Sequence, residues 1–327
     1  MKRLIALLAA IAMVLTAVLV RGLLDDDSGS GSVEGSEGGD EGLELICGPE
    51  LVAACNTLAS EAGGVKVTQQ PEQETAAAIA TGELELAAGT AWLAAGDWPA
   101  ITAAGDPGSA GSAIGGLIAS EVLARSPAVM VARTDRMDVV TEHCGEPDWA
   151  CVGSAAGTSW TELGGPVGWG RVEVALPDTA TGSGMTTTSQ AVASEVGSSD
   201  FATNDLDDPT YSRWIDQLAE ASAANASSTS PLVQFVTVPF SLSVVGALES
   251  EAIGELADVA TAEELTVVAP APVATADVRL WSADEDALAS ALERLGDIPG
   301  ALSGSRWRVA GSGVNTAPPE LQALEPT

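Results

Sequence analysis

The sequence predicts an α/β fold of two lobes that follows a membrane-spanning start. Three observations predict it. The chain has 327 residues, about twice the length of a domain of roughly 150 residues. From residue 43 onward, short apolar runs typical of strands alternate with segments typical of helices, as in parallel β-α-β units. The first 24 residues form an apolar run behind two basic residues.

The apolar start comes first in the chain. Lys2 and Arg3 precede an uncharged run at residues 4–20, and the apolar character continues to residue 24. As a helix the uncharged run spans roughly 25 Å. No cysteine lies near its end and no small-residue cleavage site follows directly, so we expect residues 1–24 to be an uncleaved, single-pass signal anchor in the lipid bilayer. The alternative is a cleaved signal peptide and a secreted protein. Both interpretations leave the basic residues in the cytoplasm and the rest of the chain outside it.

Residues 25–42 read DDDSGSGSVEGSEGGDEG. Glycine, serine and acidic residues with a single valine cannot bury enough apolar surface to offset the entropy of ordering. We therefore expect a disordered, extended acidic linker here, which tethers the folded part to the membrane.

Charge and histidine content exclude several classes of function. The chain has 46 acidic and 13 basic residues, a net charge of −33. A nucleic-acid-binding surface needs the opposite sign, so nucleic acid is not an expected partner. The single histidine, His143, excludes histidine-cluster metal sites and most histidine-based triads. No metal or other cofactor is expected. No nucleophile with a base is evident either, and Ser183 lacks the G-x-S-x-G spacing; we expect no enzyme.

The four cysteines form two close pairs in the sequence. Outside the cytoplasm they can oxidise. Four cysteines permit three pairings, and local closure favours Cys47 with Cys55 and Cys144 with Cys151. A redox or metal-binding role is the alternative, but neither pair has the C-x-x-C spacing.

The first elements alternate regularly. Residues 43–47 (LELIC) predict a strand, and Pro49 begins a helix that runs to residue 58, because proline suits the first helical turn. A strand at 65–69 and a helix at 72–81 follow. Residues 84–88 predict a third strand that ends at Gly89 and Thr90.

Later elements continue the pattern. Residues 128–132 predict a fully buried strand, and residues 172–176 a strand that ends in PDTATGSG directly before a helix running to residue 196. The remaining expectations are a loop with helix at 148–165, helices at 211–223 and 284–295, strands at 232–238, 243–248 and 266–269, and a polar tail from residue 311.

These runs together resemble a known family. The order LELICGPELV, VTQQPEQETAAAIATGELELAAGTAWL, RSPAVMVAR, VEVALPDTATGSGM, VTVPFSLSVVGAL and RWRVAG is similar to bacterial extracellular solute-binding proteins of the type II periplasmic binding fold, near the molybdate-binding-like branch. The resemblance implies two α/β lobes joined by two crossover strands, near residues 126–133 and 236–247. Lobe one would be residues 43–132 and 243–327, and lobe two residues 133–242.

Such a fold places its ligand beyond the carboxyl ends of the strands. Helix N-termini there offer unpaired N–H groups, which favour an anion or carboxylate without a cationic side chain. The loops that end the predicted strands, and the residue before the first crossover, supply the candidate ligand-binding residues Gly48, Gly89, Thr90, Ser126, Thr179, Thr181, Gly182 and Ser183. The alternative for the hydroxyl residues Thr179, Thr181 and Ser183 is a plain helix cap.

Other side chains bear on that site. Glu50 lies where it would repel an oxyanion. Arg133 and Arg171 are candidates to clamp a carboxylate, with a surface ion pair as the alternative. Four of the eight tryptophans fall near predicted cleft loops and could stack on a sugar or an aromatic solute, with packing in the core as the alternative: Trp92, Trp98, Trp160 and Trp169.

The sequence therefore predicts a membrane-tethered, extracytoplasmic solute-binding protein that captures a small molecule or anionic solute between two lobes. The resemblance implies an ABC permease as the membrane partner. The alternative is a surface sensor or scaffold that keeps the fold but binds no ligand and acts through protein contacts.

Overall fold

A mixed β-sheet organises the chain. The computed structural model describes residues 42–105, 108, 113–199, 207–224, 229–238 and 240–310. Their ten strands form one sheet with the path β2-β1-β3-β9-β5-β7-β6; β8 and β10 also pair with β5, and β4 pairs with β9. The predicted anchor, and all of the predicted linker except Gly42, lie outside these residues. Within the described ranges, no helix combines the length and the apolar character that a bilayer crossing requires.

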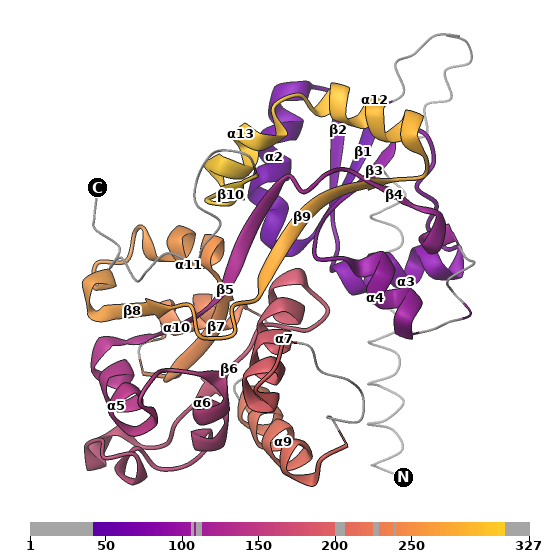
Figure 1. Ribbon diagram of the computed structural model, residues 1–327. Coiled ribbons are helices and arrows are strands. Elements are labelled where there is room, and N and C mark those ends of the chain that lie inside the picture. Colours follow the sequence, from indigo (N-terminus) through magenta and orange to yellow (C-terminus); the bar gives the residue numbers. More distant parts are fainter. Residues whose placement is uncertain are drawn as a thin grey trace, which may run out of the picture. The chain divides into compact units, whose positions relative to one another are not determined.

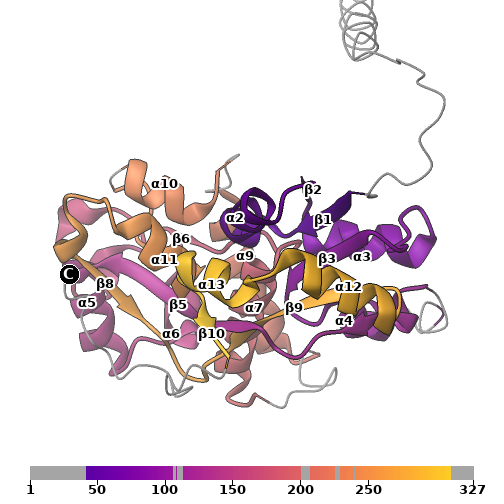
Figure 2. The ribbon, with the colours of Figure 1, turned by 90° about the horizontal axis from the view of Figure 1, so that it is seen from above.

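One half of the sheet is built from parallel strands with an antiparallel neighbour. β1 pairs in parallel with β2 and β3, and β9 runs antiparallel to β3. The helices α2, α12 and α13 pack on one face and α3 and α4 on the other (Figures 1 and 2). The elements of this half are β1 (Leu43–Cys47), η1 (Pro49–Leu51), α2 (Val52–Ala62), β2 (Val65–Gln69), α3 (Glu72–Thr81), β3 (Thr90–Ala95), α4 (Trp98–Gly105), η3 (Ala113–Gly116), β4 (Ile118–Ala119), β9 (Thr275–Ser282), α12 (Glu285–Leu295), α13 (Ile298–Gly304) and β10 (Arg308–Val309).

The other half surrounds the end of β5. β7 runs antiparallel to β5 and parallel to β6, and β8 lies on the other side of β5. Its elements are β5 (Ala124–Arg133), α5 (Thr134–Cys144), α6 (Trp149–Ala155), η4 (Trp160–Glu162), η5 (Val167–Trp169), β6 (Val174–Ala175), α7 (Gly182–Val196), α9 (Pro209–Ala224), α10 (Pro231–Thr237), β7 (Val244–Leu248), α11 (Glu249–Leu256), η6 (Ala262–Glu264) and β8 (Leu265–Val268).

Two segments connect the halves. β5 pairs with β9 through Ala124–Pro127 and with β7 through Ala128–Ala132, so this strand makes the first crossing where the sequence predicted one. The second crossing predicted at residues 236–247 is wrong, because β7 stays beside β5 and β6. The chain returns instead through β8 and β9, and Figure 1 shows β9 beside β5. The strand pairing therefore places the second crossing near Pro270, between β8 and β9, and not at Ser243.

The core follows the two-residue period of the strands. In β5, Met130 packs toward α6 and α7, while Val129 and Val131 pack toward α10 and α11. In β1, Leu45 packs beneath α2, while Ile46 faces the α3 side. Both faces of the sheet are therefore covered, as the almost continuous apolar strands require. The described residues, from Gly42 to Ala310, cluster into one compact unit.

Most predicted elements are present, and both predicted disulfides, Cys47–Cys55 and Cys144–Cys151, are confirmed. Two predicted strands are wrong. Residues 84–88 precede the third strand, which is β3 at Thr90–Ala95. Residues 232–237 lie in helix α10, where Pro231 is in the first turn and the Ser230 hydroxyl accepts from the Val233 N–H. Here the cap and the proline outweigh the strand preference of a β-branched run.

Candidate functional site

Two glutamate carboxyls lie on the first backbone amides of α7. Glu50 belongs to the turn after β1, and Glu72 is the first residue of α3, after β2. The Gly182 N–H donates to Oε2 of Glu72 at 3.2 Å, and the Ser183 N–H donates to Oε1 of Glu50 at 3.0 Å. The first amides of a helix have no partner within the helix and lie at its positive end, so they suit a carboxylate. Side chains of the chain itself therefore occupy the amides predicted to hold an anion.

Glycine at two positions permits this close approach. A Cβ on Gly48 would overlap the Glu72 carboxyl, and a Cβ on Gly182 would overlap the Ala95 carbonyl and Oε1 of Glu50. The backbone of Gly48 can therefore contact the Glu72 carboxyl, and the backbone of Gly182 can contact the Glu50 carboxyl. In the sequence GPE, Gly48 lies two residues before Glu50, and in the sequence TGS, Gly182 is the first residue of α7.

The two carboxyls also contact each other. Oε2 of Glu50 and Oε1 of Glu72 are buried, and no N–H or hydroxyl of the described residues reaches them. The charge of Glu72 also raises the pKa of the Glu50 carboxyl, so the two groups interact. One proton shared by the pair would satisfy both remaining oxygens, as in carboxyl dyads in which both groups cannot ionise together.

Burial determines how these groups titrate. Glu72 is 0% exposed, and burial raises the pKa of its carboxyl to about 7. Burial, followed by the charges of Glu72 and Glu251, raises the pKa of Glu50 well above its usual value. Near neutral pH the pair therefore keeps a proton that exposed glutamates have lost.

A third carboxyl, that of Glu251 in α11, extends the cluster. Its Oε2 accepts the Ser183 hydroxyl at 2.5 Å and the Leu248 N–H at 2.9 Å. Burial raises the pKa of Glu251 as well. Ser183 thus joins glutamates from both halves of the sheet: its amide binds Glu50 and its hydroxyl binds Glu251. We call Glu50, Glu72 and Glu251 the carboxyl cluster.

The structure brings only some of the predicted ligand-binding residues together. Gly48, Gly182 and Ser183 surround the carboxyl cluster. Thr181 caps α7, because its hydroxyl accepts the Gly184 N–H at 3.1 Å, which agrees with the alternative interpretation for this residue. Thr179 is exposed in the preceding loop. Ser126 is buried in β5 and its hydroxyl accepts the Ser250 N–H at 3.0 Å, which ties β5 to α11.

Gly89 and Thr90 lie at the opposite end of the strands, where β1 and β3 begin. Thr90 begins β3 and is level with Glu44 at the start of β1, and the Gly89 carbonyl accepts the Glu44 N–H. Because the predicted strand ended where the true strand begins, these two residues are far along the strand from Gly48. The end of β3 that meets α7 is Ala95, which the sequence interpretation missed.

The sequence interpretation also missed Glu72. An acidic residue in the first turn of a helix is common and needs no partner beyond the helix itself. A usable signal was present: Pro-Glu follows both β1 and β2, so two parallel strands end in the same dipeptide at the same edge of the sheet. Glu50 had been noted only as a group that repels an oxyanion.

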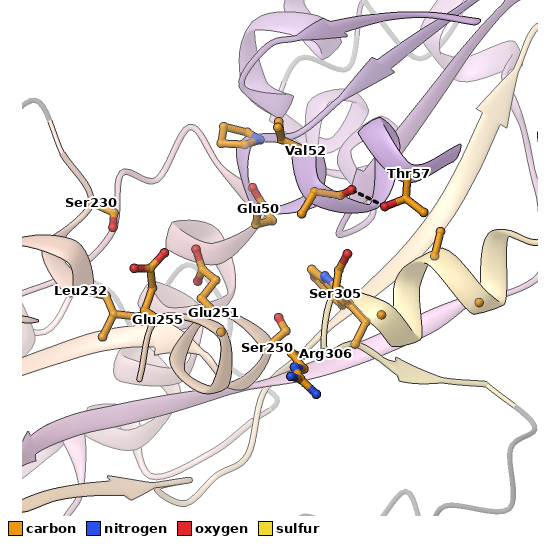
Figure 3. A pocket seen from close by; sticks show the side chains of 17 residues that line it. Glu50, Val52, Thr57, Ser230, Leu232, Ser250, Glu251, Glu255, Ser305 and Arg306 are labelled. Carbon is orange, nitrogen blue, oxygen red and sulfur yellow. Dashed lines mark hydrogen bonds between the residues drawn. The ribbon is translucent and has the colours of Figure 1, made fainter. Parts of the chain in front are cut away.

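A cavity of about 650 Å³ opens beside the carboxyl cluster. α2, α10, α11 and α13 bound it, and Figure 3 shows Glu50, Glu251 and Glu255 around its interior. The Ser250 hydroxyl, on a residue that is 4% exposed, has no hydrogen-bonding partner among the described residues. Arg306 is the one basic residue in the wall. The size suits a small ligand, and the wall offers mainly carboxyl and hydroxyl oxygens.

The predicted arginine and tryptophan candidates lie elsewhere. Arg133 donates to Glu264 at 2.9 Å, so the ion-pair interpretation is confirmed for this residue, and both Arg133 and Arg171 line a second cavity. Trp92, Trp98 and Trp160 are buried in the core. Trp169 lines the second cavity.

Comparisons with known proteins give distant likenesses. No protein-family model matches the sequence, and no curated protein matches it. Among solved structures, a Bordetella parapertussis protein assigned as an extracellular solute-binding protein has 12% identity and a TM-score of 0.47, covering 83% of this chain and 85% of its own. The Trichodesmium protein IdiA (FutA), in complex with iron and citrate, has 10% identity and a TM-score of 0.46, covering 83% and 87%. A variant of the OxyR2 regulatory domain from Vibrio vulnificus has 13% identity and a TM-score of 0.46, covering 83% and 100%. These neighbours include both solute-binding proteins and regulatory domains, and at these scores they carry no argument about function.

Proposed function

We propose that this chain is an extracytoplasmic solute-binding protein whose ligand enters the cavity of about 650 Å³ beside the carboxyl cluster. The observation that supports this best is the meeting of strand ends from both halves of the sheet, at Glu50, Glu72 and Gly182, next to a cavity of ligand size. In open α/β sheets, this edge is where ligands bind. The two disulfides are typical of an oxidising, extracytoplasmic compartment.

The lining selects the chemistry of the solute. Carboxyl groups already hold the helix amides that an oxyanion would use, and Glu50, Glu251 and Glu255 face the cavity. A second anion there would meet like charges, which costs free energy in a partly desolvated site. The solute that fits is a small amine or polyol, which donates hydrogen bonds to carboxyl and hydroxyl oxygens. This differs from the anion that the strand-end geometry suggested.

The proposal includes a place in the cell. Residues 1–24 would anchor the chain in the membrane as a single-pass helix and residues 25–42 would tether the folded part, with secretion after cleavage as the alternative. The solute would shift the equilibrium between an open and a closed form of the protein. The size of that shift is set by the difference between the solute's affinities for the two forms. The closed, loaded form would then be presented to an ABC permease.

A thermal-shift panel tests the binding claim. Amines, polyols, amino acids and oxyanions are screened at pH 6 and pH 8, and a ligand at 100 times its Kd raises stability by about 2.7 kcal/mol. We expect amines or polyols to raise the Tm and Glu255→Gln to weaken that effect, with Glu220→Gln on α9 as a matched control that removes one charge outside the cavity. A Tm increase only with oxyanions contradicts the proposed chemistry.

One observation favours a second function. The helix amides that would hold a guest are filled by Glu50 and Glu72, so the fold is complete without any ligand. A surface sensor or scaffold that acts through protein contacts fits that arrangement. No Tm increase with any compound of the panel, at either pH, favours this function over solute binding.

A further inference from the structure

A second cavity, of about 770 Å³, lies at the end of the β5-β7-β6 sheet, away from the carboxyl cluster. It is formed where β5 ends and α5 begins, where the chain enters β6, and where it enters β7. Its wall combines three arginines, two aromatic rings and two acidic residues, together with backbone and serine hydroxyls: Arg133, Arg136, Arg171, Trp169, Phe240, Asp135 and Glu173.

Basic residues are rare in this protein, so their grouping is informative. The chain has 13 basic residues against 46 acidic ones, and three of the 13 line this one cavity. Arg133 is neutralised by Glu264 at 2.9 Å and Asp135 at 3.6 Å. Arg171 is exposed and forms no ion pair with another described residue. Arg136 and Arg171 therefore remain in the wall without an ion pair to a described carboxylate.

Arg136 is the unusual member of the group. Only 7% of it is exposed. Its guanidinium carbon lies 3.4 Å from the centroid of the Trp169 ring and 5.1 Å from that of the Trp160 ring. No hydrogen bond or ion pair joins its guanidinium to another described residue, and its buried Nη1 has no partner there. Burial also lowers the pKa of Arg136 below its ordinary value.

A buried guanidinium nitrogen without an acceptor, such as Nη1 of Arg136, is costly, because its desolvation is not offset by a hydrogen bond. The tryptophan faces return part of that free energy through cation–π contact, but they accept none of the five N–H groups. Asp135 is adjacent in sequence, but it pairs with Arg133, and no ion pair joins it to Arg136. A group of this kind in a cavity is the arrangement found where a ligand supplies the missing acceptor.

The surroundings suit one class of ligand. A planar guanidinium presents a fork that matches a carboxylate in a bidentate manner. The first turn of α5, to which Arg136 belongs, has no side-chain cap, so its positive end adds to the attraction. Phe240 is 69% exposed with a positive φ of 68°, and the Arg133 guanidinium lies 5.0 Å from its ring centroid. An exposed aromatic ring beside a basic cavity suits the apolar part of a ligand.

We infer that this cavity binds a small organic carboxylate, whose carboxylate pairs with Arg136 and whose apolar group contacts Trp169 and Phe240. The site is separate from the cavity beside the carboxyl cluster, which offers oxygens instead of N–H groups. The protein would thus have one cavity for a solute that donates hydrogen bonds and another for an acid. This inference goes beyond the proposed function and does not depend on it.

Matched probes test the inference. Phenylacetate and its neutral amide, phenylacetamide, have nearly the same shape, and inorganic phosphate tests for a general oxyanion site. Binding of each to the full chain is measured by calorimetry and by thermal shift. We expect phenylacetate to bind and to raise the Tm, while phenylacetamide and phosphate do neither.

Variants separate a binding role for Arg136 from a structural one. Arg136→Met should weaken phenylacetate at least about tenfold, which is the loss expected for a charged hydrogen-bonded pair. Without ligand its Tm should equal or exceed that of the wild type, because an unpaired buried charge is removed. Arg294→Met on α12 removes one charge elsewhere and should leave phenylacetate binding unchanged.

Three results would overturn the inference. The first is equal binding of the acid and the amide, and the second is binding of phosphate alone. The third is a lower Tm of Arg136→Met together with no binding of phenylacetate to the wild type, because Arg136 would then only support the tryptophan packing. Arg136→Met and Glu255→Gln assign any bound compound to the second or the first cavity, so failure of one proposal is distinguishable from failure of the other.

Discussion

Replacing Glu72 by glutamine should remove a pH dependence of stability that this carboxyl imposes. The variant keeps the shape of the side chain, and its amide oxygen can still accept the Gly182 N–H. Its NH₂ group donates to Glu50 at any pH, in place of the shared proton. Glu72→Gln therefore preserves the contacts of the carboxyl pair and removes one titration.

The magnitude follows from the shifted pKa. The pKa of Glu72 lies at about 7 instead of the ordinary 4.5, and each pKa unit corresponds to about 1.4 kcal/mol. Between these two values the folded state binds a proton that the unfolded state has released, so the free energy of unfolding falls as the pH rises. The loss begins near pH 4.5, is complete above about pH 7 and amounts to about 3 kcal/mol. Since the pair titrates as a unit, this value belongs to Glu50 and Glu72 together.

Urea unfolding at pH 5 and pH 8, at one ionic strength, measures the effect. Other acidic groups also change charge over this range, but they do so equally in both proteins and cancel in the difference. We expect the wild type to lose about 2.5 kcal/mol more than Glu72→Gln between the two pH values. Glu74→Gln, an exposed neighbour on the same helix, is the matched control and should behave like the wild type. Equal pH dependence in wild type and Glu72→Gln would refute a protonated pair.

Three further predictions concern the framework of the site. Gly182→Ala should lower the free energy of unfolding by about 2 kcal/mol, because the added Cβ would overlap the backbone at the end of β3. Gly254→Ala is the control, because this helical glycine has open space around it, and it should not lower the free energy of unfolding measurably. Gln190→Leu should cost about 3 kcal/mol in chemical denaturation, since the buried amide binds a tryptophan N–H and two backbone carbonyls, and a cost below 1 kcal/mol would contradict these bonds. Under dithiothreitol, mass spectrometry of alkylated thiols should show Cys144–Cys151 opening before the fully buried Cys47–Cys55; the reverse order would contradict the burial.

Local patterns in the sequence predicted much of the fold. The Gly-Pro-Glu after β1 and the Thr-Gly-Ser before α7 carry their own start signals, so the helix starts they predict are correct. Cysteine spacing predicted both disulfides, because closing seven or eight residues needs little chain. These features depend on residues close together in the chain.

Features that depend on distant residues were harder to predict. The predicted third strand begins six residues before β3. The segment LELAAGTAWLAA is apolar over most of its length, and the spacing of apolar residues alone does not locate a buried strand within it. β9 carries the return crossing, but its sequence, TADVRLWS, mixes apolar residues with an aspartate and an arginine. Its place is set by pairing with β3 and β5, some 150 or more residues away.

The site shows the same division. The sequence indicated that Gly182 and Ser183 offer amides to an anion, and the structure agrees that they bind carboxylate oxygens. It did not indicate that the oxygens belong to Glu50 and Glu72, 133 and 110 residues away. An acidic residue at a helix start has the same local signature whether it faces water or a second helix, and only the tertiary packing decides between them.

Carbon-13 NMR of glutamate side-chain carboxyls, followed across a pH titration, tests most directly whether the chain's own acids fill the amides of α7. We expect the resonance of Glu72 to change near pH 7, and we expect Glu72→Gln to remove that change. A wild-type spectrum in which every glutamate has titrated by pH 5.5 would mean that these carboxyls are solvated and that the amides of α7 are free to bind a guest.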